Sequence, residues 1–244
     1  MSVEYKTLSQ FYNGIICDDA YSSWLDFLAK TLKSKNPEPF GIDFACGTGL
    51  FTRKVKALGY SVVGVDISPD MLAVAEETTR NEKLNIKYFV GDFKNFKLKE
   101  KQGFITAVND GFNYVPITGL KKAIKNCYDS LKNNGVLMFD VSTPYKLKEV
   151  LAKNMFGDDG EELSYIWLSE FISDSSRLDI TISFFKKEGE VYKRFTEQQS
   201  QYAHEKEDIE NILKTVGFTN FTVTDENGNP LTKTSQKMLF IATK

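Results

Sequence analysis

The chain has 244 residues, of which 41% are hydrophobic and 26% are charged, and its formal net charge is -2. Such a composition is typical of a globular protein with a sizeable core, and the balance of 31 basic and 33 acidic residues provides no global positive field for nucleic acid or an anionic membrane. Because the first residues lack a signal-peptide pattern and no apolar run could span a bilayer, we expect a cytoplasmic protein. Three widely spaced cysteines favour neither a disulfide framework nor a zinc site, so we expect no metal.

The first part of the chain predicts helices and the next part an alternation. Apolar residues at largely helical spacing end at the sequence NPEP, residues 36–39, which predicts lead-in helices over residues 1–36. Strands are then predicted over 40–45, 60–68, 85–92, 103–110 and 135–142, and helices over 48–59, 68–82 and 120–135. Parallel neighbours need long crossovers, so this alternation predicts a doubly wound, mostly parallel α/β sheet.

After residue 142 the alternation is interrupted. Residues 162–173, 176–189 and 190–204 read as three successive strands without intervening helices, which predicts an antiparallel β insertion, residues 160–203, that forms a lid. A helix over 204–217 and strands over 218–225 and 236–244 follow, and we expect that last pair to form an antiparallel edge. We expect one domain over residues 1–244.

Polar side chains stand at the ends of five predicted strands, where an open parallel sheet binds its ligands. Solvated charges have no reason to follow the register of a sheet, so we expect these groups to line one crevice. They are Asp43, Asp66, Asp92, Asn109 with Asp110, and Asp140.

The second and third of these strand ends have the groups that a nucleoside needs. Asp66 is placed to accept hydrogen bonds from both hydroxyls of a ribose, and Asp92 to accept one from the amine of an adenine, with Ile67 and Phe93 as apolar faces for the ring. Glycines just after the first strand, Gly47 and Gly49, would let a ligand lie against bare backbone. The pattern indicates a nucleoside-containing ligand.

The glycine pattern decides between nucleosides. Thr52 stands where the dinucleotide fingerprint has its third glycine, and no phosphate-binding P-loop is present. The sequence DFACGTG, residues 43–49, resembles instead the first motif, D-x-G-x-G-T-G, of the class I S-adenosylmethionine-dependent methyltransferases. Residues 103–143 also resemble the fourth strand, helix and fifth strand of that family. The chain is similar to small bacterial members with a β insertion after the fifth strand.

This resemblance implies a seven-stranded Rossmann-like fold, S-adenosyl-L-methionine as cofactor, and a set of contacts. Asp43 would face the cofactor's amino group, Gly47 and Gly49 its methionine portion, Asp66 the ribose, and Asp92 with Phe93 the adenine. Ala45 replaces the first glycine of the motif and adds a methyl group there. The cofactor set implied in full is Tyr12, Asp43, Ala45, Cys46, Gly47, Gly49, Asp66, Ile67, Met71, Gly91, Asp92, Phe93 and Asn109.

The reaction that follows is methyl transfer by in-line displacement, in which alignment of the reactants supplies most of the catalysis. We expect a small-molecule acceptor with an N or O nucleophile, bound between the lead-in helices and the lid. Trp24, Trp167 and Tyr202 are the candidate substrate contacts, and Tyr12, His204 and Tyr202 the candidate catalytic groups. His204 could instead cap the helix that follows it, and most lid aromatics could simply pack.

Three other functions compete with this prediction. Methylation of RNA or protein requires a basic mouth, and the lysine pairs at 121–122 and 186–187 are too isolated to supply one. A nicotinamide oxidoreductase is disfavoured by Thr52. A non-enzymatic S-adenosylmethionine-binding sensor would use the same cofactor residues. For Asp43, capping of a helix N-terminus is the alternative to ligand binding.

Overall fold

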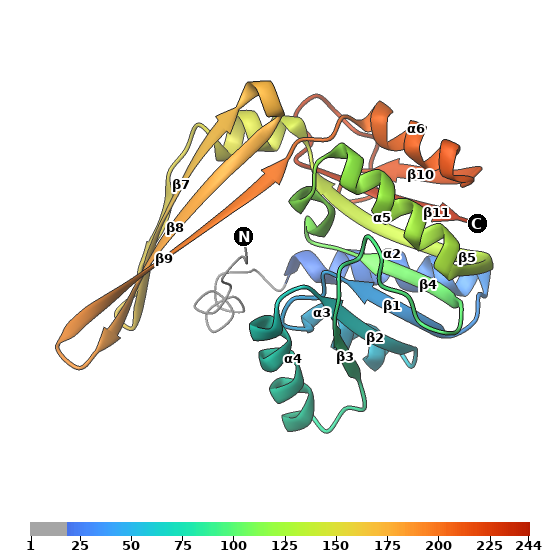
Figure 1. Cartoon of the computed structure of the whole chain (residues 1–244), viewed down its shortest axis with the longest axis horizontal. Coiled ribbons are helices and arrows are strands. Elements are labelled where there is room, and N and C mark those ends of the chain that lie inside the picture. The colour runs from blue at the N-terminus through green and yellow to red at the C-terminus, as the bar shows by residue number, and fades with distance from the viewer. Residues whose placement is uncertain (1–18) are drawn as a thin grey trace.

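The computed structural model describes residues 19–244, with side chains from residue 21 on. Its body is a seven-stranded sheet with helices on both faces, and a separate four-stranded sheet projects from the body (Figure 1). Strands β1 to β5 are parallel, while β11 is antiparallel to both of its neighbours, β5 and β10. The order across the large sheet is β10-β11-β5-β4-β1-β2-β3, which confirms the predicted fold class.

The helices and strands that surround the site have the following bounds. The helices of the described part are α2 (Asp19–Lys35), α3 (Leu50–Ala57), α4 (Pro69–Asn81), α5 (Ile117–Ser130) and α6 (Lys206–Val216). The large sheet contains β1 (Phe40–Phe44), β2 (Ser61–Asp66), β3 (Lys87–Val90), β4 (Gln102–Ala107), β5 (Leu131–Ser142), β10 (Asn220–Thr224) and β11 (Lys237–Thr243). The lid sheet contains β6 (Phe156–Asp159), β7 (Leu163–Ile172), β8 (Arg177–Glu188) and β9 (Val191–Tyr202).

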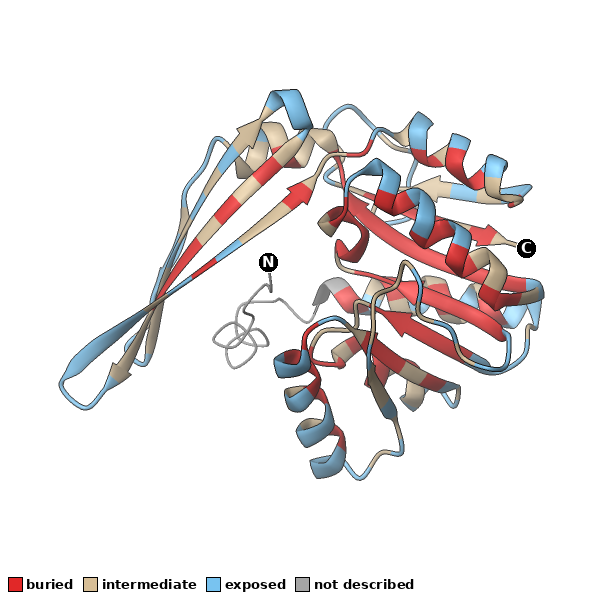
Figure 2. Cartoon of the chain, in the orientation of Figure 1, coloured by how far each residue is buried: buried red, intermediate tan, exposed pale blue. Residues whose placement is uncertain are grey.

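Two cores flank the large sheet because its central strands alternate apolar side chains between the two faces. On one face, Ile42 of β1 and Phe139 of β5 pack with the buried sides of α5 and α6. On the other, Phe104 of β4 and Met138 of β5 pack with α2 and α3. Figure 2 shows the central strands buried and the outer surfaces of the helices exposed. The central strands therefore form a rigid base for the loops that follow them.

Three short elements and two boundaries differ from the sequence prediction. The structure adds β6 to the expected three lid strands, a 3-10 turn η1 (Gly111–Tyr114) after β4, and a π-helix η2 (Lys146–Leu151) after β5. Helix α5 starts before residue 120 and ends at Ser130, so that residues 131–134 begin β5 instead of extending the helix. His204 is not the cap of α6, whose N-cap is Glu205.

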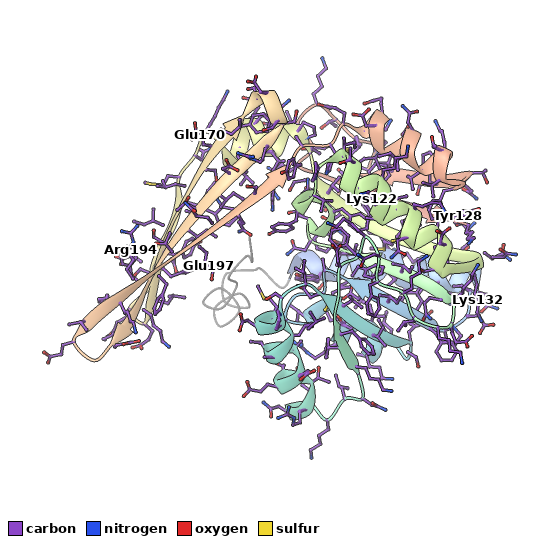
Figure 3. The ribbon with its side chains drawn as sticks, in the orientation of Figure 1. Lys122, Tyr128, Lys132, Glu170, Arg194 and Glu197 are labelled. Carbon is purple, nitrogen blue, oxygen red and sulfur yellow. The ribbon has the colours of Figure 1, made fainter. Side chains whose placement is uncertain are left out.

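The lid sheet is a single layer with one apolar face. Leu178, Ile180, Ile182 and Phe184 alternate along β8, are almost fully buried, and form one apolar cluster with Leu147 of η2. The hairpin that joins β8 to β9 lies at the far, exposed end of the projection (Figures 1 and 2). Figure 3 adds the side chains, with Glu170 of β7 and Arg194 and Glu197 of β9 labelled along this sheet. No helix in residues 19–244 combines the length and apolarity that a membrane span requires.

Candidate functional site

Four loops meet at the carboxyl edge of the parallel strands, and we call them the crest loops. They follow β1 (residues 45–49), β2 (66–68), β3 (91–93) and β4 (109–111). Hydrogen bonds join the first three, because the Gly47 N–H donates to Asp66 Oδ2 over 2.8 Å and the Gly91 N–H donates to the Asp66 carbonyl over 2.9 Å. The fourth lies against the first, since a Cβ built on Gly111 would be 2.7 Å from the Cβ of Ala45. The predicted crevice residues of these loops are thus brought together.

Asp66 lies at the centre of this junction. Its carboxylate, which is partly exposed, accepts the Gly47 N–H on one oxygen and the Ser68 N–H on the other, over 2.8 and 2.9 Å. Burial raises the pKa of Asp66, although the backbone N–H groups of Ser68 and Gly47 oppose that shift. A carboxylate has about four lone-pair sites, so capacity for a ligand remains. Beside it, Ile67 is 64% exposed, which places an apolar side chain in solvent next to a polar anchor.

The loop after β1 is built from left-handed residues. Ala45, Gly47 and Gly49 have φ angles of 51°, 53° and 73°, a region that glycine adopts without the steric cost that other residues incur. Gly49 also precedes α3, which begins with no side-chain cap on its N-terminal N–H groups. Cys46, between Ala45 and Gly47, contributes no thiolate, because burial raises the pKa of its thiol well above the usual value.

Ala45→Gly tests the strain at the departure from the family motif. Alanine at a positive φ costs about 1–2 kcal/mol, and glycine removes this strain. Glycine also loses more conformational freedom on folding, which cancels part of the gain. We expect the variant to be more stable by about 1 kcal/mol and to melt about 2–4 °C higher. Ala57→Gly, in helix α3, is the matched control and should lose about 1 kcal/mol. Equal losses in both variants would mean that Ala45 is not strained.

Asp43 supports the crest from below. It is 1% exposed, and its two oxygens accept the hydroxyl hydrogens of Thr52 and Thr106 over 2.6 and 2.7 Å. It does not cap a helix, because the N-cap of α3 is Gly49 and no side chain bonds to that helix end. Because the side chain is buried, neither carboxylate oxygen of Asp43 is exposed for the predicted direct contact with a ligand amino group. Sequence reasoning missed both threonines, whose hydroxyls satisfy this buried charge.

The burial of Asp43 predicts a pH dependence of stability. Burial raises the pKa of Asp43 to about 6, against the opposing hydrogen bonds from Thr52 and Thr106. The folded state then holds the proton more tightly than the unfolded state, so stability rises as the pH falls through about 6. Between about pH 7 and about pH 5 the gain from this group is about 1 kcal/mol. Denaturant titrations at the two pH values should show that the free energy of unfolding of Asp43→Asn lacks this increase. The same increase in the variant as in the wild type would contradict the prediction.

The loop after β3 is ordered by its own aspartate. Asp92 Oδ1 accepts the Lys94 N–H over 2.9 Å, and Oδ2 pairs with Lys94 Nζ at 3.1 Å. Phe93 lies with its ring centroid 5.3 Å from that of Phe112. The predicted adenine contacts Asp92 and Phe93 are thus partly exposed groups at the crest, but Asp92 shares its carboxylate with a neighbouring ammonium.

The predicted crevice residues Asp110 and Asp140 are not solvent-facing groups. Asp140 is fully buried, and its carboxylate accepts the backbone N–H groups of Asn109 and Asp110. Lys237 of β11 donates to Asp110 Oδ1 over 2.6 Å and to Asp140 Oδ2 over 2.9 Å. The extension of the crevice to β5 is therefore wrong, because this carboxylate holds the neighbouring loop. Lys237, which sequence reasoning missed, completes the cluster.

The root of the lid sheet is attached to the crest by one buried amide. Asn113 of η1 donates to the carbonyls of Tyr202 and Ser142 over 2.9 and 3.3 Å, and its oxygen accepts the Ser142 N–H over 2.9 Å. Next to it, the Tyr114 hydroxyl lies 3.0 Å from Gln199 Oε1 of β9. The C-terminal end of β9 is therefore fixed directly beside the loop that follows β4.

Several predicted substrate and catalytic residues have other surroundings. His204 is 1% exposed and its Nε2 lies 3.3 Å from the Phe112 carbonyl; burial lowers the pKa of His204, so it is a neutral packing residue without access to substrate. Trp24 is 1% exposed and lies in the core beneath α2, which removes it from any substrate surface. The indole N–H of Trp167 is bonded to Ser169 Oγ over 2.7 Å. Tyr202 is half-buried at the lid root, and Tyr12 lies outside the described residues.

Met71 of α4 is 4% exposed, and its N–H donates to Ser68 Oγ, the cap of that helix, over 3.2 Å. Within residues 19–244, no group of three or more His, Cys, Asp or Glu side chains is arranged to bind a metal ion.

Comparisons with known proteins agree with this architecture. Residues 42–135 match the family model for a methyltransferase domain. YqeM of Bacillus subtilis, named as a methyltransferase, is 29% identical over 98% of this chain and 97% of its own length. The crystal structure of an S-adenosylmethionine-dependent methyltransferase from Clostridium acetobutylicum is 30% identical, covers 98% of each chain and superposes with a TM-score of 0.85. The sugar N-methyltransferase KedS8 from Streptoalloteichus, at 20% identity over 98% of this chain and 92% of its own, has a TM-score of 0.77.

Proposed function

We propose, since this chain belongs to the class I S-adenosylmethionine-dependent methyltransferases, that it methylates a small molecule held between the crest loops and the lid sheet. The family makes the chain an enzyme with S-adenosyl-L-methionine as cofactor. The acceptor class is our inference, and the attachment of the lid root to the loop after β4 through Asn113 is the observation that carries it.

The crest loops fit the cofactor by their chemistry. An adenosyl group needs a hydroxyl acceptor beside an apolar surface, and Asp66 with the exposed Ile67 supplies that pair at the end of β2. The methionine part needs backbone free of side chains, which we assign to Gly47, because a Cβ on Gly49 would instead meet the Tyr88 hydroxyl. The cofactor's carboxylate is suited to the uncapped N-terminus of α3, which follows Gly49. We therefore assign the cofactor to Asp66, Ile67, Gly47, Gly49 and the partly exposed Asn109.

The reaction then needs alignment more than it needs a reactive side chain. S-adenosylmethionine supplies a methyl group on a positively charged sulfur. The acceptor's lone pair forms the new bond to that carbon while the carbon–sulfur bond breaks, and the acceptor loses one proton to solvent or to a base. Alignment alone can contribute about 7–11 kcal/mol to such a displacement. The burial of His204 leaves no histidine for proton removal, which favours an amine or an already acidic hydroxyl.

The lid sheet favours a small acceptor over a macromolecule. The alternate residues of β8 are almost fully buried, so the apolar surface left for a partly apolar molecule is that of the half-buried Trp167 and Phe195 beside them. KedS8 is described as a sugar N-methyltransferase, but its likeness to this chain concerns the fold, so the acceptor class rests on the lid itself.

A fractionated metabolite screen tests the proposal. Cell extract is divided into a low-molecular-weight pool and a macromolecular pool, each is incubated with S-adenosylmethionine and the enzyme, and release of S-adenosylhomocysteine is measured. We expect release with the small-molecule pool and its loss in the Asp66→Ala variant. Release that requires the macromolecular pool, and that nuclease or protease treatment abolishes, would overturn the assignment of the acceptor.

A further inference from the structure

Four charged side chains meet beneath the loop that follows β4. Lys237 of β11 bridges the carboxylates of Asp110 and Asp140 over 2.6 and 2.9 Å, and Lys146 of η2 lies 3.7 Å from the second oxygen of Asp110. The side chains of Lys237 and Asp140 are 11% and 0% exposed. Two cations thus balance two anions in a region that excludes most water.

The balance matters because the loop has an uncommon backbone conformation. Asn109 and Asp110 are consecutive residues with φ angles of 61° and 66°, a left-handed region that asparagine and aspartate enter more readily than other non-glycine residues, but as single residues and seldom two in a row. Their two backbone N–H groups point to the same carboxylate, that of Asp140. Two successive backbone N–H groups thus bind one carboxylate, so the Asp140 side chain determines the path of the loop, although burial raises the pKa of Asp140.

The same loop borders the cofactor loop on one side and the lid on the other. Gly111 lies against Ala45, close enough that a Cβ on Gly111 would approach the Cβ of Ala45 to 2.7 Å. Asn113, two residues further on, holds the end of β9. A change in the path of residues 109–111 would therefore reach both substrates of the proposed reaction.

We propose that Lys237 is a positioning residue for methyl transfer: by neutralising Asp110 and Asp140 together, it holds the loop after β4 in the shape that the cofactor requires. This inference rests on the proposed placement of the cofactor at the crest loops. Lys237 touches no substrate in this scheme and acts through the loop.

The surroundings of Lys237 show what its loss would leave. The Trp24 ring covers Lys237, whose Nζ lies 5.2 Å from the ring centroid. An uncharged ring cannot replace the lysine as a positive charge for the two carboxylates. Despite burial, Asp110 and Asp140 raise the pKa of Lys237, and together with Lys146 this ammonium holds the pKa of Asp110 well below its usual range. Glu226, in the loop before β11, also interacts electrostatically with Lys146 and acts to raise its pKa, while burial lowers it. Without Lys237, two buried carboxylates share only Lys146, and one of them must bind a proton or move.

The test compares the affinity for S-adenosylhomocysteine in Lys237→Met, Lys237→Arg and wild type, by calorimetry at about pH 6 and about pH 8. We expect roughly tenfold weaker binding by Lys237→Met at the higher pH, with near wild-type binding by Lys237→Arg. Relative to wild type, the methionine variant should recover at the lower pH, because protonation of one carboxylate removes the repulsion. A merely structural lysine would give no such pH-dependent ratio. Lys233→Met, at an exposed position of the preceding loop, is the matched control.

If Lys237→Met does not fold, the balanced variant Lys237→Met/Asp140→Asn replaces it, since Asp110 keeps Lys146 as its partner. We expect this double variant to bind S-adenosylhomocysteine with nearly wild-type affinity at both pH values, because the neutral amide, like a protonated carboxylate, removes the repulsion. Wild-type affinity of folded Lys237→Met at both pH values, or roughly tenfold weaker binding by the double variant at both, would overturn the role of Lys237. Failure of the wild-type enzyme itself to bind S-adenosylhomocysteine would instead overturn the placement of the cofactor, so the two failures are distinguishable.

Discussion

Replacing Asp66 with alanine should weaken the binding of S-adenosylhomocysteine by about 2–3 kcal/mol, or roughly 30- to 150-fold. The reason is twofold. The variant loses the carboxylate proposed to accept the ribose hydroxyls, and it also frees the Gly47 and Ser68 N–H groups that this carboxylate now holds at 2.8 and 2.9 Å. Because both effects act on the ligand-binding loops, the loss should exceed that of any single exposed carboxylate.

Asp70, four residues after Asp66, provides the control. Asp70 is exposed in the first turn of α4 and no hydrogen bond from its side chain joins the described crest loops. Asp70→Ala should change affinity little, while Asp66→Asn, which keeps one acceptor oxygen, should fall between the two. Calorimetry on the three variants distinguishes these outcomes. Equal affinities for wild type and Asp66→Ala would exclude the ribose role.

The second large effect is expected at Asn113. Its side chain is fully buried and makes three hydrogen bonds to the backbone of Ser142 and Tyr202, and alanine would leave those groups without partners. We expect a loss of about 3 kcal/mol of stability, seen as a melting temperature lower by about 6–12 °C. Where the variant remains folded, a loosened lid root should raise the KM for the acceptor more than it weakens cofactor binding.

A matched asparagine separates this effect from the substitution itself. Asn211 is exposed on α6, a helix in which alanine is the better helix former, so Asn211→Ala should melt at or slightly above the wild-type temperature. Kinetics with the acceptor found in the metabolite screen then give the KM for both variants. Proportional changes in acceptor KM and cofactor affinity for Asn113→Ala would argue against a specific role in holding the lid.

The large sheet could be predicted from sequence because its signals are local. The strand of residues 61–66 is an apolar run that ends in a carboxylate, and the strand of residues 40–44 has a carboxylate next to its last residue. Ser68 with Pro69 marks the start of α4, where the side chain of Ser68 does accept the Met71 N–H. Strand β6 and the turn η1 contain four residues each, which is too short for a periodic pattern. Residues 131–134 continued a helical spacing, but pairing of Leu131 with Gln102 of β4 places them in a strand.

The site residues likewise fall into those that local sequence signals could place and those that depend on long-range contacts. Asp66, Ile67, Gly47 and Gly49 could be placed at the crest because each lies at or within a few residues of the carboxyl end of a predicted parallel strand. The surroundings of Asp43 could not be predicted, since Thr106 binds it from 63 residues away. Lys237 likewise meets Asp140 across 97 residues. Contacts of that range depend on strand order, and residues 143 to 203, which separate β5 from the last part of the sheet, carry no sequence signal for where β11 inserts.

The two ends of the lid insertion lie next to each other, since one amide, that of Asn113, bonds to Ser142 where the insertion leaves β5 and to Tyr202 where β9 ends. A segment that departs from and returns to one point can lengthen, shorten or be replaced without altering the register of the seven strands behind it. Under the proposed function, acceptor preference could therefore change through this module while the crest, the proposed cofactor site, stays constant. Grafting the corresponding segment of a homologue between residues 143 and 202 is thus the direct way to alter the acceptor that we propose.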